Sequence, residues 1–125
     1  REEAMATERF NRLHPSAERR TPMVTSLLSE SAGPITAVTD FMCAVPEQVG
    51  RYVPTGRPFK VLGTDGMGRS DTRESLRRHF EVDCGHVVVS TLEGLADLGE
   101  IDRSLVADAI ARYEIDPEAV DPFPV

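Results

Sequence analysis

The apolar positions along this chain fall into two kinds of segment. Two short runs, Ile35–Thr39 and Phe59–Leu62, are rich in β-branched or aromatic residues and have the length of short strands. Elsewhere the apolar residues recur three or four positions apart, which places them on one face of a helix. The pattern predicts an α/β fold with two short strands and about six helices.

Two helices are expected before the first strand. Arg1–Leu13 has a modest apolar face, and Pro15 ends it because proline disfavours helical backbone in the residue before it. The pair Thr21-Pro22 is typical of a helix start, with a hydroxyl N-cap followed by proline at the first helical position. We therefore expect a second helix that runs to about Glu30.

The segment Asp40–Val53 places four apolar side chains at helical spacing, which predicts a third helix. Pro46 lies inside this segment. A proline in a helix interior removes one hydrogen bond and costs about 3 kcal/mol. Two alternatives follow: the helix kinks at Pro46, or it begins there. The turn Pro54–Pro58 then leads into the second strand.

Three helices are expected after the glycine-rich loop that follows the second strand. Each is preceded by an aspartate that can act as an N-cap, and the first of them has a glutamate three residues later, as in a capping box. These N-cap residues are Asp71, Asp83 and Asp102. A last turn and the Pro-rich tail Asp121–Val125 complete the chain.

The segment Asp83–Leu98 contains three consecutive valines, a composition that favours a strand. We nevertheless predict a helix. Val82 and Val87 have the spacing of a hydrophobic staple around an N-cap, and the following apolar residues keep helical spacing. Gly99 then provides a C-terminal stop.

Charge and composition narrow the class of protein. The 125 residues suffice for one small domain, and their net charge of -7 argues against nucleic acid or an anionic membrane as a partner. No run approaches the ~20 apolar residues of a membrane span. Cys43 and Cys84 form no C-x-x-C, so thiols in a reducing compartment are favoured over a disulfide. The chain begins at Arg1, which fits processing, tag removal or origin as a fragment.

The loop Gly63–Asp71 joins a strand to a helix, a place where backbone N–H groups can bind phosphate. Neither the P-loop pattern nor G-x-G-x-x-G is present, and Asp65 and Asp71 would repel an anion. The favoured interpretation is therefore structural, with glycines that allow positive φ or close packing and Asp71 as a cap.

The remaining polar residues offer no clear active site. The histidines lack metal-ligand spacing. Cys84 is near a helix N-terminus, which can lower the pKa of a thiol, but the neighbouring Asp83 weakens that effect. Three arginines form a basic helix face, either solvated and salt-bridged or serving as an interface or carboxylate clamp. We therefore expect no catalytic, cofactor-binding or metal-binding residue in this chain. The residues considered are His14, His79, His86, Cys84, Arg73, Arg77 and Arg78.

One long segment resembles a family signature. Val61–Asp83 reads VLGTDGMGRSDTRESLRRHFEVD and is similar to LGTDGFGRSD-[ST]-R-x-x-LR-x-HFEVD, the pattern near the C-terminus of the homodimeric, decarboxylating pyruvate dehydrogenase component of the transketolase superfamily. Met67 replaces the usual Phe. Further segments resemble the same family in register: Arg9–Pro15, Ala37–Pro54, where Cys43 replaces a basic residue, and Leu95–Asp116.

The resemblance implies a role as part of a larger enzyme. Family members have three domains, and two of them bind thiamine diphosphate and Mg²⁺ through a GDG…NN motif that is missing here. Residues 1–125 resemble the third, C-terminal domain, an α/β structure with a small mixed sheet whose first strand–helix–strand unit is expected upstream of Arg1. The resemblance therefore implies that two or three strands of the mixed sheet remain in this chain. We expect a single, incomplete domain that is inactive by itself and has a structural or assembly role.

The same resemblance implies the setting of that larger enzyme. The parent would decarboxylate pyruvate and acetylate the lipoyl group of the next enzyme, dihydrolipoyl acetyltransferase, as a cytoplasmic homodimer. The alternative is a free-standing ligand-binding or regulatory α/β domain that uses the loop Gly63–Asp71.

Overall fold

The centre of the molecule is a pair of parallel strands, β1 (Ile35–Val38) and β2 (Phe59–Leu62). Their register pairs Ile35 with Phe59 and Val38 with Leu62. The two strands predicted from the sequence are thus confirmed, and β1 ends one residue earlier than expected. Because parallel strands need a crossover connection, the chain between them passes through two short helical segments.

The computed structural model describes residues 1–123, so the last two residues of the expected tail lie outside the described residues. Within that range the chain forms two strands, six α-helices and one 3₁₀ helix. The helical elements are α1 (Glu2–Leu13), α2 (Met23–Ser29), α3 (Ala44–Glu47), η1 (Gly50–Tyr52), α4 (Arg73–His79), α5 (Cys84–Asp97) and α6 (Ser104–Arg112).

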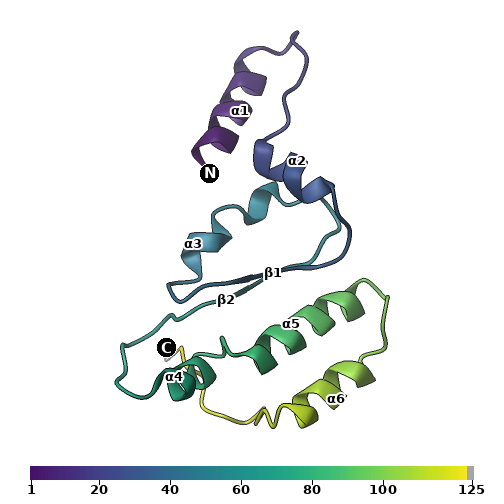
Figure 1. Ribbon diagram of the computed structural model, residues 1–125. Helices are drawn as coiled ribbons and strands as arrows, with labels where there is room; N and C mark the ends of the chain where they lie inside the picture. Colours follow the sequence, from purple (N-terminus) through teal and green to yellow (C-terminus); the bar gives the residue numbers. More distant parts are fainter. Residues whose placement is uncertain (124–125) are drawn as a thin grey trace.

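The elements lie in layers on the two sides of the strand pair (Figure 1). Helix α5 packs against both strands, and α6 packs on the far side of α5. The hydroxyls of Thr36 on β1 and Thr91 on α5 lie 3.1 Å apart. On the other side of the strands lie α2 and α3, and α1 extends beyond α2 (Figure 1).

The helix predicted at Asp83–Leu98 is confirmed as α5, despite its three valines. The Asp83 side chain accepts a hydrogen bond from the backbone N–H of His86 at 2.9 Å. At the other end Gly99 has a φ of 73°, and the Glu100 N–H donates to the Leu95 carbonyl at 3.0 Å. A cap at each end and burial against the sheet therefore outweigh the β-propensity of the valines.

The structure corrects the start of α2. Thr21 makes no capping hydrogen bond, and Pro22 itself occupies the N-cap position, so the helix begins at Met23. The Met23 N–H instead donates to the carboxylate of Glu3 on α1 at 3.0 Å. A side chain from another helix therefore satisfies a free donor of the first turn, which local sequence does not reveal.

The other two caps are shifted by one residue. Thr72, rather than Asp71, caps α4, since its hydroxyl accepts from the Ser75 N–H at 3.2 Å. Asp71 accepts from the Thr72 N–H at 2.7 Å and so supports the cap indirectly. Before α6, Asp102 accepts from the Ser104 N–H at 2.8 Å, while Arg103 holds the N-cap position.

The prediction of one helix over Asp40–Val53 is wrong in both of its forms. The segment contains only the short α3 and η1, and Phe41 and Val45 are 57% and 45% exposed. Pro46 lies within the first turn of α3. The N–H groups of a first turn have no acceptor within the helix, so a proline there costs no helical hydrogen bond. The Phe41 carbonyl accepts from the Thr64 N–H at 2.9 Å, so the start of this segment is bound to the loop after β2.

The core is thin for a chain of this size. Among the described residues the buried hydrophobic side chains are those of Ala4, Tyr52, Phe80 and Ala109, each at most 9% exposed. The chain exposes 8767 Å², whereas a compact monomer of its mass exposes about 6,600 Å². About 2,200 Å² of additional surface is therefore accessible. Among the described helices, none is long and apolar enough to cross a membrane.

Candidate functional site

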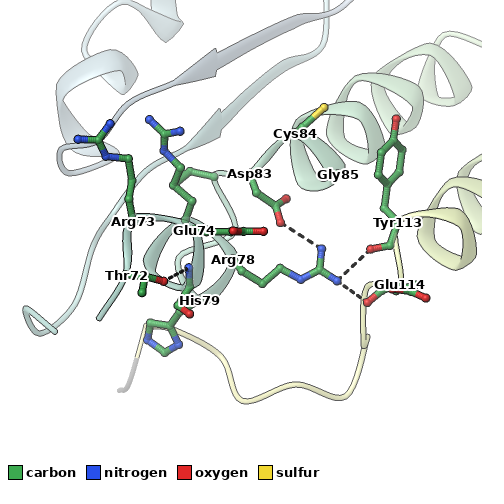
Figure 2. A pocket seen from close by; sticks show the side chains of 13 residues that line it. Thr72, Arg73, Glu74, Arg78, His79, Asp83, Cys84, Gly85, Tyr113 and Glu114 are labelled. Carbon is green, nitrogen blue, oxygen red and sulfur yellow. Dashed lines mark hydrogen bonds and ion pairs between the residues drawn. The ribbon is translucent and has the colours of Figure 1, made fainter. Parts of the chain in front are cut away.

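A cluster of charged side chains joins the last three helices (Figure 2). Arg78 on α4 donates through Nη1 to the Asp83 Oδ2 atom at 3.1 Å, and through Nη2 to the backbone carbonyls of Tyr113, at 3.0 Å, and Glu114. One guanidinium group thus connects the end of α4, the start of α5 and the residues that follow α6. This arrangement uses the planar, multi-donor geometry of arginine.

Asp83 has three polar contacts in this cluster. Its Oδ1 atom accepts from the His86 backbone N–H and lies 2.7 Å from His86 Nδ1, while Oδ2 accepts from Arg78. Partial burial of the carboxylate opposes its ionisation. The hydrogen bonds from His86 and Arg78 outweigh that effect, so the pKa of Asp83 lies below its ordinary value. Asp83 is therefore an ionised structural group.

The helices of this junction approach each other closely at Gly85. A Cβ atom at this position would lie 2.9 Å from the Cβ of Tyr113. The absence of a side chain at Gly85 therefore brings the start of α5 against the end of α6, and this places the Tyr113 and Glu114 carbonyls within reach of Arg78. The cluster depends on a small residue as much as on its charges.

The loop Gly63–Asp71 leaves the carboxyl end of β2 and is bound to the chain that leaves β1. The Asp65 Oδ2 atom accepts from the Cys43 N–H at 2.9 Å. A Cβ at Gly63 would lie 2.8 Å from the Phe41 carbonyl oxygen, so the two segments are in close contact there. Partial burial, together with the Asp65 carboxylate, raises the pKa of the Cys43 thiol to about 11. Hydrogen bonds from Cys43 lower the pKa of Asp65.

A groove lies between this loop and α4. Its base is apolar, with Leu76, Phe80 and Val82, and its polar lining comes from both the loop and the helix. The charged members are Arg69, Arg73, Arg77, Asp40 and Asp71. The groove is at the carboxyl ends of parallel strands, the position where open α/β sheets bind ligands.

The structure places the predicted residues in different environments. Arg73 and Arg77 are exposed, whereas Arg78, predicted to share their face, is half-buried in the helix junction. His14 stacks on Phe10 at a ring distance of 4.2 Å, and His79 Nδ1 lies 3.3 Å from the Arg69 guanidinium. Among the described residues, no group of three His, Cys, Asp or Glu side chains could hold a metal ion.

Two further polar contacts were not predicted from the sequence. Lys60 on β2 forms ion pairs with Glu93 and Asp97 on α5 at 3.1 and 2.9 Å. The Arg57 guanidinium donates to the carbonyls of Gly33 and Leu28 and so holds the chain before β1. The i, i+4 spacing of Glu93 and Asp97 was the available signal, but their partner lies on a strand more than 30 residues away.

The polar contacts of Arg78, Lys60 and Arg57 stabilise the packing of helices and strands. Together with the fold, they define a small α/β module. No family model matches the sequence. The chain is 48% identical over 123 residues to the pyruvate dehydrogenase E1 component of Pseudomonas aeruginosa, and 50% identical over 115 residues to that of Escherichia coli. The E1 component of Mycolicibacterium smegmatis is 49% identical over 114 residues.

These matches cover 98%, 92% and 91% of the chain but only 14%, 13% and 12% of the respective relatives. Over nearly its whole length, the chain is therefore homologous to a segment of the pyruvate dehydrogenase E1 component.

Proposed function

We propose that the chain is the C-terminal structural and assembly module of a pyruvate dehydrogenase E1 component. Two observations support this role. The homology extends over 98% of the chain but only 14% of a relative. The polar cluster of the candidate site joins helices to one another, and its side chains bind backbone carbonyls and each other.

The thin core is the observation that carries the structural role. The roughly 2,200 Å² of additional surface has the size of a large protein–protein interface. Exposed large apolar residues occur on α1 and α2 and around the ends of the strands. They include Met5, Met23, Leu27, Val38, Phe41, Met42 and Val45. Patches of this kind mark surfaces that are covered in an assembly, and in our proposal other parts of the parent protein cover them.

In this proposal the parent oxidatively decarboxylates pyruvate on thiamine diphosphate and transfers the acetyl group to the lipoyl group of dihydrolipoyl acetyltransferase. Thiamine diphosphate and Mg²⁺ are held by the other two domains, and this chain contributes no catalytic or cofactor-binding residue. The parent acts as a homodimer in the cytoplasm, and the present chain contacts the other domains of its own subunit or those of the second subunit.

Split-protein reconstitution tests the proposal. The parent lacking these 125 residues is expressed with and without the separate chain. We expect the two parts to co-purify and to recover pyruvate decarboxylation, whereas the chain alone shows no activity and no thiamine diphosphate binding in calorimetry. Full activity of the truncated parent would refute the structural role, and magnesium-dependent cofactor binding to the chain alone would refute its non-catalytic assignment.

The groove beside the loop Gly63–Asp71 favours a second candidate, a free-standing ligand-binding or regulatory α/β domain. The two candidates differ in what the gene encodes before Arg1. A GDG…NN motif several hundred residues upstream in the same reading frame would select the E1 module, and a start codon directly before Arg1 would select the free-standing domain.

A further inference from the structure

The groove between the loop and α4 contains three arginines in a chain that is otherwise acidic. Arg69 comes from the loop, and Arg73 and Arg77 lie one helical turn apart on α4. In residues 1–123, neither Arg73 nor Arg77 forms an ion pair, whereas Arg51, Arg78 and Arg103 each do. Figure 2 shows the Arg73 side chain extending away from the Arg78–Asp83 pair.

The groove combines positive side chains with unused backbone donors. Within the described part of the chain, no backbone N–H from Gly66 to Asp71 donates a hydrogen bond to another residue. Gly66 and Gly68 are both exposed, and a Cβ at Gly68 would meet no atom within 4 Å. Free N–H groups of a glycine-rich loop next to arginines are the donors that bind phosphate and carboxylate groups.

The charge balance of the groove also favours an anion. Three arginines face two aspartates, Asp40 and Asp71, so the lining carries a net charge of about +1 within a chain of -7. One Asp71 oxygen already accepts from the Thr72 N–H at 2.7 Å. Asp65, which the sequence suggests would repel an anion, accepts from the Cys43 N–H and does not line the groove.

We propose that Arg69, Arg73 and Arg77 form, with the Gly66–Asp71 backbone, a binding site for a small molecule with at least two phosphate or carboxylate groups. The arginines supply bidentate donors, the loop supplies N–H groups, and Leu76 and Phe80 offer an apolar floor for the rest of the ligand. The proposal does not depend on the assembly role described above, because the site is complete within this chain.

Calorimetric titration of the chain at low ionic strength tests the site, with inorganic pyrophosphate and citrate as separate probes. We expect at least one probe to bind. Tighter binding of pyrophosphate would indicate a phosphate ligand, and tighter binding of citrate would indicate a carboxylate ligand. In the double variant Arg73→Gln/Arg77→Gln, the affinity should fall at least about tenfold. Both side chains are exposed, so circular dichroism should show an unchanged fold.

The matched control is Arg12→Gln/Arg112→Gln. It removes the same two charges from exposed positions in the last turns of α1 and α6, outside the groove. We expect its affinity to stay within about twofold of the unmodified chain, since general attraction by net charge changes equally in both double variants. Equal weakening in the two variants, or no binding of either probe at millimolar concentration, would overturn the proposal.

Discussion

Arg78 and Asp83 are five residues apart in the sequence, and their ion pair spans the tight connection between α4 and α5. The same aspartate caps α5, and the same arginine holds the carbonyls that follow α6. Two side chains therefore link the ends of three helices. Arg73, Arg77 and Val82 line both this junction and the groove proposed to bind anions, so the two features are neighbours.

Removal of the Asp83 carboxylate should destabilise the chain and reduce its sensitivity to acid. The pKa of Asp83 is lowered in the folded state, so its stabilising effect is present above the unfolded pKa, near 4, and is lost as the pH falls through the folded pKa. Asp83→Ala should cost about 1–3 kcal/mol at pH 7, because it removes a cap and takes away the ion-pair partner of Arg78. Urea denaturation of both proteins between pH 7 and pH 3 measures the effect, and a constant difference across that range would contradict it.

Two helices end at a glutamate with left-handed backbone. Glu81 after α4 has a φ of 57°, and Glu114 after α6 has a φ of 51°. This conformation costs a residue with a Cβ about 1–2 kcal/mol, and glycine is the usual residue at such a helix end. Glu81→Gly should therefore stabilise the chain by up to about 1 kcal/mol, after the entropy cost of glycine is included. Thermal unfolding tests this prediction. The substitution Gly99→Ala, at a position with a φ of 73°, should instead destabilise the chain.

The cap of α4 can be assigned by a pair of substitutions. Thr72→Ala should cost about 1 kcal/mol, since it removes the hydroxyl that accepts from the Ser75 N–H. Asp71→Ala should cost less, because its carboxylate bonds only to the N–H of the next residue. The comparison is made by chemical denaturation under identical conditions. A larger loss from Asp71→Ala would show that Asp71 is the N-cap, as the sequence pattern suggests.

The two thiols should differ in reactivity. The pKa of Cys43 is raised to about 11 by burial and by Asp65, so little of it is thiolate at pH 8, whereas Cys84 is exposed. Brief alkylation with iodoacetamide followed by peptide mass spectrometry should find Cys84 modified well before Cys43. In the variant Asp65→Asn, Cys43 should react faster than in the unmodified chain. Preferential modification of Cys43 in the unmodified chain would contradict the structure.

The isolated chain should self-associate or show low solubility. Its two-stranded sheet has unpaired edges, and large apolar side chains such as Phe41 and Met67 are exposed. Sedimentation velocity over a wide concentration range should show an average mass that rises with concentration. A strictly monomeric species that unfolds cooperatively at high concentration would mean that the domain needs no covering partner.

The sequence by itself determined the elements whose signals are local. Asp83 caps a helix through a backbone N–H only three residues away, and Gly99 ends that helix through its own conformational freedom, so α5 could be predicted despite its valines. Likewise, β-branched composition sufficed to locate the strand at Ile35. The family resemblance also arose from residue order alone, and the homologous E1 components confirm it.

Tertiary structure decided the features that depend on distant partners. Residues 40–53 have a helical apolar pattern, yet the hydrogen bond from Thr64 to the Phe41 carbonyl holds the start of this segment beside the second strand. The start of α2 depends on Glu3, twenty residues away, and the Arg78 guanidinium donates to carbonyls 35 and 36 residues further on. Such contacts form only when the elements pack, because local spacing carries no information about which backbone groups will meet.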